Sequence, residues 1–406
     1  MASASAGTAR AEAGKGSALE VFGAFLVLGL TSFGGPVAHL GYFRRAFVER
    51  RRWLDEAAYA DIVALCQFLP GPASSQTGLM IGLSAAGYPG AAAAWLGFTT
   101  PSAIAMTLFA LAAPGLTRAL GGGWLHGLRL AAVAVVAQAV LAMSRSLTPD
   151  PPRATLAVAA ALAALWAPSQ LTQLAVIAVG LLVGLAAFRT QTGAERPPLP
   201  VFVKPPVAIA ALAVFAVLLI GLPLAARVSG DHGLDVFARF YRVGSLVFGG
   251  GHVVLPLLQA EVVPSGWISQ GAFLTGYGAA QAVPGPLFTF SAYLGAAMAP
   301  APNGWAGAAI CLIAIFLPSF LLIVGAAPFW NALRSRSWAR GALAGANAAV
   351  VGLLAAALYT PVWTSAVASP TDVGLVLVAF LLLTSWRAPP WLVVSLSAVA
   401  AQAISA

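Results

Sequence analysis

The sequence predicts an all-α polytopic membrane protein with two homologous, inverted helical repeats that contain broken or re-entrant helices. Of its 406 residues, 60% are hydrophobic and 8% are charged, and the apolar residues are spread over nearly the whole chain. Apolar runs of about 16–25 residues recur, and a helix that spans a bilayer needs roughly 20. No run alternates with the period of two that is typical of a transmembrane barrel, so a helical bundle is expected.

Charge and cysteine content fit the same class. The polar segment 1–16 precedes the first apolar run without a signal-peptide cleavage pattern, so we expect a retained N-terminal tail. The net charge of +9 comes from cations beside apolar segments, which indicates membrane topology rather than nucleic-acid binding. Cys66 and Cys311 have no partner at metal-ligand spacing, so we expect neither a disulfide nor a metal site.

An internal repeat divides the chain. The sequence FGGP at 33–36 recurs as FGGG at 248–251, roughly 215 residues later, and QFLPGP at 67–72 recurs as QAVPGP at 281–286. Three further landmarks follow the same order: Trp53-Leu54 with Trp267-Ile268, Pro101-Ser102 with Pro318-Ser319, and Gly127 with Gly341. Five matched landmarks in one order make chance an inadequate explanation.

The landmarks predict a first transporter repeat at 17–188 and a second at 234–406. Residues 189–233 between them contain a polar, proline-rich linker and one additional transmembrane helix, Val207–Ala226. A duplicated membrane protein of this plan usually binds its substrate between the repeats. A duplicated scaffold with no transport role is the alternative.

Loop charges indicate that the two repeats are inverted. The loop after the first motif carries Arg44, Arg45, Arg50, Arg51 and Arg52, and its counterpart at 259–267 carries no arginine. A later loop reverses this bias, with Arg118 in the first half against Arg334, Arg336 and Arg340 in the second. Because positive charge favours the cytoplasmic side, equivalent loops are expected on opposite faces.

Two observations favour parallel repeats instead. Arg227, Arg239 and Arg242 lie just before or within the start of the second half, where inversion places them outside. Counting every apolar segment as a crossing also gives an even number before the second half. Inversion therefore requires that some apolar segments are short or re-entrant.

The strongest candidate site is the motif Pro-Gly-Pro at 70–72 and at 284–286. Proline removes a backbone donor and glycine costs about 1 kcal/mol in a helix interior, so the helix must stop there. A helix that restarts with Pro72 or Pro286 at its first position points free N–H groups and its positive dipole end toward the break, where they can bind an anion. A kink that only shapes packing is the alternative.

Glycine, hydroxyl and amide groups near the breaks complete the candidate substrate site. The glycine runs permit either a second break or close helix packing, and the sequence leaves both open. The candidate substrate-binding residues are Gly34, Gly35, Gln67, Gly71, Ser74, Ser75 and Thr77 in the first half, and Gly249, Gly250, Gly251, His252, Gln281, Gly285, Thr289 and Ser291 in the second.

Asp61 and His39 are the candidates for proton coupling. Acids within apolar segments mark proton or ion relays, and histidine titrates near neutral pH. Asp61 is the deepest of three acids, with Asp55 and Glu56, that precede the first Pro-Gly-Pro. The alternatives are that these acids form interfacial ion pairs with the arginines at 50–52, and that His39 and His252 are structural hydrogen-bond partners.

No nucleotide-binding loop, zinc-protease motif, nucleophile elbow or catalytic triad spacing is present, so we expect neither an enzyme nor a bound cofactor. A channel would need a continuous polar stripe along one helix, which the sequence lacks. The expected partners are an oxyanion and the lipid bilayer. A homodimer is compatible with the sequence, and no nucleic-acid partner is expected.

The motifs FGGP, arginine-rich loop, Trp-Leu and LPGP, followed by FGGGHVVLP, Trp and VPGPLFTFSAYLG, resemble the long, two-domain form of the chromate ion transporter family. The resemblance covers nearly the whole chain. It implies a multi-pass carrier of the bacterial inner membrane that exports chromate from the cytoplasm, confers chromate resistance, and uses a potential- or proton-linked secondary mechanism. A carrier for sulfate or another tetrahedral oxyanion is the alternative. ASSQTGL in the first half stands where the second has LFTFSAYL, so unequal contributions are expected.

Overall fold

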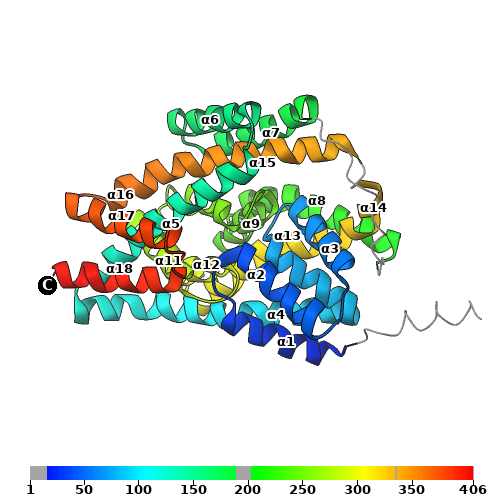
Figure 1. Ribbon diagram of the computed structural model, residues 1–406, viewed down its shortest axis with the longest axis horizontal. Coiled ribbons are helices and arrows are strands. Elements are labelled where there is room, and N and C mark those ends of the chain that lie inside the picture. The colour runs from blue at the N-terminus through cyan, green and yellow to red at the C-terminus, as the bar shows by residue number, and fades with distance from the viewer. Residues whose placement is uncertain (1–15, 189–202, 334–335, 406) are drawn as a thin grey trace, which may run out of the picture.

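The structure is a computed structural model that describes residues 16–188, 203–333 and 336–405, and helices make up most of these ranges (Figure 1). The polar tail at 1–15, the proline-rich linker at 189–202 and Arg334 lie outside the described residues. Helices of the first half are α1 (Ala18–Thr31), α2 (Gly35–Arg44), η1 (Arg45–Arg50), α3 (Glu56–Phe68), α4 (Ala73–Leu120), α5 (Gly123–Leu147), α6 (Pro151–Trp166) and α7 (Gln170–Ala187).

The second half repeats this order after one additional helix, α8 (Pro205–Ser229). Its helices are α9 (His232–Leu246), η2 (Gly251–Val253), α10 (Val254–Val262), α11 (Gln270–Ala282), η3 (Leu287–Thr289), α12 (Phe290–Ala297), α13 (Gly304–Ala326), η4 (Ala327–Phe329), α14 (Trp330–Leu333), α15 (Ser337–Ala357), η5 (Leu358–Trp363), α16 (Thr364–Ala366), α17 (Pro370–Thr384) and α18 (Pro390–Ser405).

Six helical stretches within the described ranges are long and apolar enough to cross a membrane. They are α4, α5, α7, α8, the stretch 304–333 that includes α13 and α14, and the stretch 337–366 that includes α15 and α16. The described residues contain no strand. The prediction of an all-α polytopic membrane protein is therefore confirmed.

In the first half, two pairs of short helices turn back inside the molecule. The 14 residues of α1 span about 21 Å, less than the roughly 30 Å of a bilayer core. Arg44 at the end of α2 pairs with Glu56 at the start of α3, and Arg51 lies 3.4 Å from Glu20 of α1. The outer ends of both pairs therefore meet at one face, and their tips are the FGG and Pro-Gly-Pro breaks.

A bend inside α4 closes the second of these pairs. Ala86 and Gly87 have non-helical backbone angles, so the first segment of α4 ends there and a long second segment begins. Ala85 packs in the same buried cluster as Val21 of α1 and Tyr59 of α3. The first segment therefore runs from the Pro-Gly-Pro break back to the face where α1 and α3 begin.

The second half contains two equivalent re-entrant pairs, α9 with η2 and α10, and α11 with η3 and α12. Their outer ends gather around Trp267. The His232 ring lies 4.8 Å from the Trp267 ring, the Arg239 guanidinium lies 4.5 Å above it, and Ala299 N–H donates to the Trp267 carbonyl over 3.0 Å. Both pairs thus enter from one face and return to it.

The two sets of re-entrant pairs enter from opposite faces. Helix α8 begins beside α14, since Val203 and Ala208 share a buried cluster with Trp330. Its 25 residues are enough to cross a bilayer, so α9 begins at the far face. The start of α1 lies at the same end of the molecule as α14, and the C-terminus lies at the other (Figure 1). The repeats are therefore inverted, as the loop charges predicted.

Both observations that favoured parallel repeats have a structural explanation. The short paired helices do not cross the molecule, so counting every apolar segment as a crossing was wrong. Two of the three arginines near the start of the second half pair with acids: Arg239 lies 2.9 Å from Asp235, and Arg242 lies 2.6 Å from Glu261. Their charge is neutralised locally and does not set the topology.

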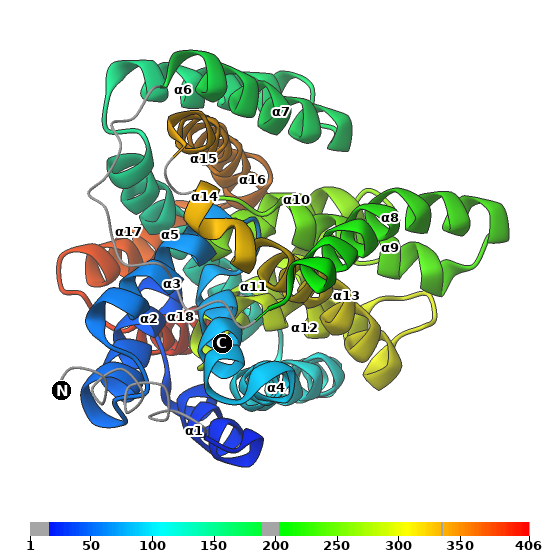
Figure 2. The same ribbon diagram turned by 90° about the vertical axis from the view of Figure 1, so that its right-hand side faces the viewer.

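The long helices exchange partners between the halves. Helix α5 packs against α17 and α18 of the second half, and α15 packs against α6 and α7 of the first, which cover it in Figure 2. Glycines allow this close approach. A Cβ atom on Gly345 of α15 would lie 2.0 Å from the carbonyl oxygen of Gly180 in α7. Neither half therefore has a complete core of its own.

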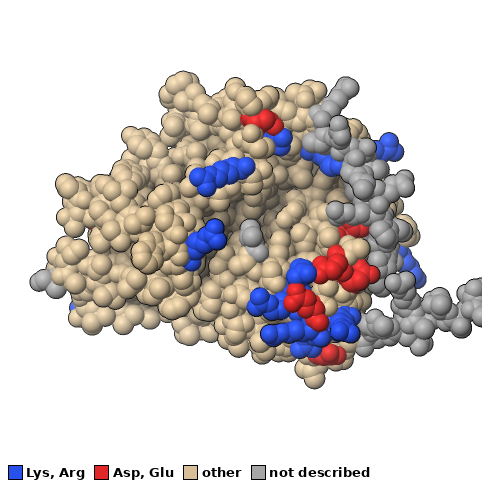
Figure 3. Space-filling model, viewed as in Figure 1, with Lys and Arg blue, Asp and Glu red and all other residues tan. Residues whose placement is uncertain are grey.

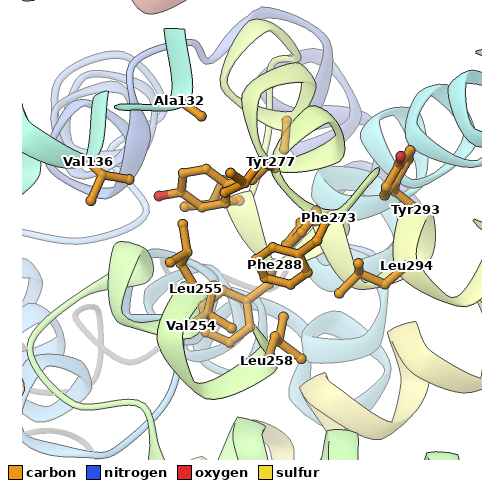
Figure 4. Packing of buried hydrophobic residues seen from close by; sticks show 14 of the residues in the cluster. Ala132, Val136, Val254, Leu255, Leu258, Phe273, Tyr277, Phe288, Tyr293 and Leu294 are labelled. Carbon is orange, nitrogen blue, oxygen red and sulfur yellow. The ribbon is translucent and has the colours of Figure 1, made fainter. Parts of the chain in front are cut away.

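The central core is aromatic and joins the re-entrant pairs to α5. Phe273 and Tyr277 of α11 pack beside Phe288 of η3 and against Leu255 and Leu258 of α10 (Figure 4). These side chains belong to one buried cluster that also contains residues of α5 and α15. The tips of the re-entrant helices are thus held by rigid packing rather than by flexible loops.

We expect Gly345→Ala to destabilise the protein, because the added methyl group would meet backbone atoms of α7 that cannot move aside. Overpacking of this kind costs about 1–3 kcal/mol. The measurement is the thermal unfolding of detergent-purified protein. Gly374→Ala is the matched control, since a Cβ atom there has no neighbour within 4 Å. Equal midpoints for the two variants would contradict the packing of α7 against α15.

Candidate functional site

The four helix breaks meet in pairs that join the two halves. The Gly71 N–H donates to the Val247 carbonyl over 2.7 Å, and the Gly285 N–H donates to the Ser32 carbonyl over 2.9 Å. Each Pro-Gly-Pro glycine of one half thus binds the residue that precedes the phenylalanine-glycine motif of the other half. The reciprocal bonds place all four tips together inside the molecule.

The two Pro-Gly-Pro glycines have backbone angles that strongly favour glycine. Gly71 has φ +124° and Gly285 has φ +102°, a region that side chains rarely adopt. A Cβ atom on Gly71 would lie 2.8 Å from the Ser319 hydroxyl, and one on Gly285 would lie 2.8 Å from the Ser102 hydroxyl. Each tip therefore touches a serine of the opposite half.

Ser102 and Ser319 are site residues that the sequence reasoning missed. They are repeat mates on the long helices α4 and α13, and each is almost completely buried. Their signal was present in the matched Pro101-Ser102 and Pro318-Ser319 landmarks, because a proline inside a helix leaves a backbone carbonyl without its usual donor.

The glycine motifs form second breaks, which resolves the two alternatives left open for them. Between α1 and α2, Gly34 and the first residue of α2, Gly35, have φ values of +101° and +76°. Gly249 and Gly250 separate α9 from η2 with φ values of +76° and +135°. A Cβ atom on Gly251 would lie 3.3 Å from the Pro36 ring, so the two motifs also lie against each other.

His39 links three of the tip elements. It is 1% exposed, and its Nε2 donates to the Ser32 carbonyl over 3.2 Å. With that proton on Nε2, Nδ1 accepts from the Ser74 hydroxyl over 3.3 Å. The same Ser32 carbonyl accepts from Gly285, so His39 connects α2, the end of α1 and the start of α4. This geometry fits the structural alternative, and proton coupling through His39 stays a prediction.

The hydroxyls after the Pro-Gly-Pro breaks fall into two groups. Thr77 donates to the Ala73 carbonyl and Thr289 donates to the Pro286 carbonyl, both over 2.8 Å, so local backbone satisfies them. The hydroxyls of Ser75 and Ser291 are buried and have no hydrogen-bond partner among the described residues. Buried hydroxyls without a partner are uncommon, which makes these two the better candidates for contact with a ligand.

Within the part of the chain that the structure describes, three further hydroxyls near the tips are also buried and without a partner. They belong to Ser32, Thr99 and Ser319. Ser32 and Ser319 flank the two cross-repeat hydrogen bonds, and Thr99 lies one helical turn before Ser102, whose hydroxyl donates to the Thr99 carbonyl. The tips are therefore surrounded by buried hydroxyl groups that can donate to a ligand, and none of the tip residues named above is an acid.

A small cavity opens between the tips. Its volume is about 20 Å³, enough for roughly one water molecule. The residues that line it come from three of the four tips and from the start of α18: Gly34, Gly35, His252, Ala280, Gln281, Val283, Gly285, Leu287 and Pro390. Five of these were predicted site residues, and the structure brings them together.

The two glutamines and the two histidines differ between the halves. The Gln281 side chain lines the cavity, and its amide nitrogen is buried without a partner, whereas Gln67 is exposed. Hydrogen bonding joins His252 Nδ1 to the Tyr277 hydroxyl over 2.8 Å, and His39 does not line the cavity. The halves are thus unequal, and the second contributes more of the cavity wall.

Both helix restarts depart slightly from the expectation. Pro72 is the N-cap of α4 rather than its first helical residue, and Pro286 is the N-cap of η3. The first half restarts as an α-helix, whereas the second restarts as a short 3₁₀ turn before α12. In both halves the first N–H groups after the proline have no acceptor in their own helix.

The three acids before the first Pro-Gly-Pro separate into two surface groups and one buried group. Asp55 is the N-cap of α3 and accepts from the Ala58 N–H over 2.8 Å, and Glu56 pairs with Arg44. Asp61 is 3% exposed. Glu56 thus forms an ion pair, although its partner is Arg44 rather than an arginine of 50–52, and Asp61 is the acid that lies within the helical core.

The fold and the paired breaks define an integral membrane transporter with inverted repeats. A model of the chromate transporter family matches residues 19–185 and 234–402, one match in each half. The chain belongs to the chromate transporter family. This membership, rather than a missing catalytic cluster, confirms the prediction that the protein is a transporter and not an enzyme.

Curated relatives span most of the chain. The chromate transport protein of Pseudomonas aeruginosa is 30% identical over 83% of this chain and 79% of its own length. The chromate transport protein of Cupriavidus metallidurans is 26% identical over 88% and 86%, and the probable chromate transport protein of Synechococcus elongatus is 28% identical over 76% and 75%. No solved structure matches the chain significantly.

We expect the cysteine pair Ser102→Cys and Gly285→Cys to cross-link the two halves, because the Cβ atoms at these positions would be 3.3 Å apart. Disulfides need Cβ atoms about 3.5–4.5 Å apart, so a small adjustment suffices. The pair is placed in a background with Cys66 and Cys311 replaced by alanine and with a protease site between 189 and 202.

After oxidation and cleavage, the halves should remain together on a non-reducing gel and separate after reduction. The control pair is Ser102→Cys with Gly221→Cys, since Gly221 of α8 has no neighbour within 4 Å. Separation of the halves in the first pair, despite oxidation, would contradict the meeting of the second Pro-Gly-Pro with α4.

Proposed function

We propose that the protein is a secondary carrier that exports chromate from the cytoplasm across the bacterial inner membrane and thereby confers chromate resistance. The observation that carries the proposal is the meeting of four helix breaks from both halves, reciprocally hydrogen-bonded and surrounded by buried hydroxyls without partners. The chromate transport proteins among the relatives support the choice of substrate.

The chemistry of the tips suits a dianion that must also leave. Backbone N–H groups at helix starts, positive dipole ends and the hydroxyls of Ser75 and Ser291 are donors of intermediate strength. A buried lysine or arginine among them would hold a dianion more strongly, and transport requires binding that is weak enough for release. The predicted substrate-binding residues at the four tips are therefore retained in the proposal, joined by Ser102 and Ser319.

The present geometry is a closed one. A cavity of about 20 Å³ holds one water molecule and is too small for a tetrahedral oxyanion. Binding therefore requires the tips to move apart, and the donors that become free include the N–H groups of Gly71 and Gly285. In this scheme an oxyanion replaces the carbonyl oxygens of Val247 and Ser32 as their acceptor.

The membrane potential assists export. Moving one charge across the membrane is worth about 2.3 kcal/mol per 100 mV, and a dianion leaving a negative-inside cell gains twice that amount. Proton coupling through Asp61 is the additional element of the proposal. It rests on the burial of this acid within α3, two to three turns before the Pro-Gly-Pro break.

Sulfate has the charge and the tetrahedral shape of chromate, so a sulfate carrier would use the same donors. Radiolabelled chromate flux in everted membrane vesicles, with sulfate as competitor, separates the two substrates. Chromate accumulation that is unaffected by excess sulfate supports the proposal. Sulfate transport without chromate transport would replace it with the alternative.

We expect Gly285→Leu to reduce chromate flux at least tenfold, because a side chain at φ +102° would press on Ser102 and prevent closure of the tips. The variant should still be inserted, which membrane fractionation measures. Gly374→Leu is the control and should retain flux within about twofold. Full flux in an inserted Gly285→Leu variant would exclude the tip from the transport site.

Asp61→Asn is expected to flatten the pH dependence of flux, since asparagine cannot exchange a proton. Flux is measured in vesicles at several pH values and a fixed potential. Glu56→Gln removes an acid from the same helix at the surface and should leave the profile unchanged. If Asp61→Asn has the wild-type profile, Asp61 has no part in coupling.

A further inference from the structure

Arg387 lies beside the cavity between the tips. It is three residues before Pro390, which lines the cavity with Gly34, Gly35 and Gln281, so their Cα atoms are at most about 10 Å apart. The arginine side chain is exposed. Arg387 is not one of the residues that line the cavity, so its side chain lies outside the cavity and close in the chain to a residue of its wall.

The turn that carries Arg387 is held in place. The Ala388 N–H donates to the Leu382 carbonyl over 2.9 Å, and the Trp386 N–H donates to the Leu381 carbonyl over 3.3 Å. After the turn, the Trp391 ring lies 6.2 Å from the Phe33 ring of the first glycine motif. The position of Arg387 relative to the tips is therefore set by packing on both sides.

Arg387 also has an unfavourable backbone. Its φ is +52°, a left-handed conformation that ends helices and is usually occupied by glycine or asparagine. Relative to glycine, a residue with a side chain in this conformation costs roughly 1 kcal/mol of folding free energy. A long cationic side chain thus stands where the backbone alone would favour glycine.

The charge of Arg387 is not neutralised within the described residues, since no carboxylate there forms an ion pair with it. Arg44 and Arg242 at the two outer faces pair with acids, whereas Arg387, like the exposed Arg118, forms no ion pair within the described residues. In Figure 3, basic and acidic groups gather together over η1 and α3, whereas the basic groups on the left side of the central hollow have no acidic group beside them.

We propose that Arg387 captures the oxyanion at the mouth of the cavity and delivers it to the tips. A planar guanidinium can donate two parallel hydrogen bonds to two oxygens of a tetrahedral oxyanion. Because the cation stands outside the tips, it raises the local concentration of the anion without holding it inside. This inference rests on the proposed function and names the residue that recruits the substrate.

The test compares Arg387→Gln, Arg387→Lys and the wild type in vesicle flux assays with chromate as the probe. Ionic strength is varied with sodium gluconate. We expect Arg387→Gln to raise KM for chromate about five- to tenfold at low ionic strength while the maximal rate stays within about twofold. The wild-type KM should rise with ionic strength and that of Arg387→Gln should not, because screening acts on a charge that the variant lacks.

Arg387→Lys should keep the salt dependence of KM, and its KM should lie between the values of the wild type and Arg387→Gln. Arg118→Gln is the control, because Arg118 is an exposed arginine at the end of α4. Arg387→Gly removes the charge and relieves the strain of the left-handed backbone conformation. It therefore replaces Arg387→Gln in the test if that variant does not fold. Wild-type KM and salt dependence in either folded, uncharged variant would overturn the inference. Absence of chromate flux in the wild type would instead overturn the proposed function.

Discussion

The interruption of helices inside a membrane protein sets the main constraint on this structure. A backbone N–H or carbonyl without a partner in hydrocarbon costs several kcal/mol, so broken helices survive only where protein or a wet cavity covers them. Here each half covers the breaks of the other, through Gly71 to Val247 and Gly285 to Ser32. Inversion of the repeats follows from this need, since tips entering from opposite faces can meet end to end.

The sequence predicted those features that depend on local backbone chemistry. Proline and glycine determine where a helix stops, so the Pro-Gly-Pro and glycine-run breaks were visible directly. Repetition of the landmarks revealed the two halves, and loop arginines revealed their inversion. The glycine runs remained ambiguous until the φ values of Gly34 and Gly249 showed breaks, because a glycine sequence alone fits both a break and close packing.

Features that depend on distant contacts could not be predicted from a single sequence. Ser102 and Ser319 lie in the middle of apolar helices, and only folding brings them to the glycines of the opposite half. The same holds for His39, whose partners Ser32 and Ser74 are separated along the chain by 42 residues. The exchange of α5 and α15 between the halves leaves no local pattern either, because any apolar face with small residues could accept them.

The reciprocal capping of the tips has a consequence for biosynthesis. The Gly71 N–H donates to the Val247 carbonyl, and Val247 is made about 175 residues later. At roughly 5–20 residues per second, the ribosome needs about 10 to 35 seconds to reach it. During that interval the first half stands in the membrane with an exposed break, and water, lipid headgroups or an insertion factor must solvate it. Completion of the second half, rather than insertion of the first, is therefore the step that commits the chain to its native fold.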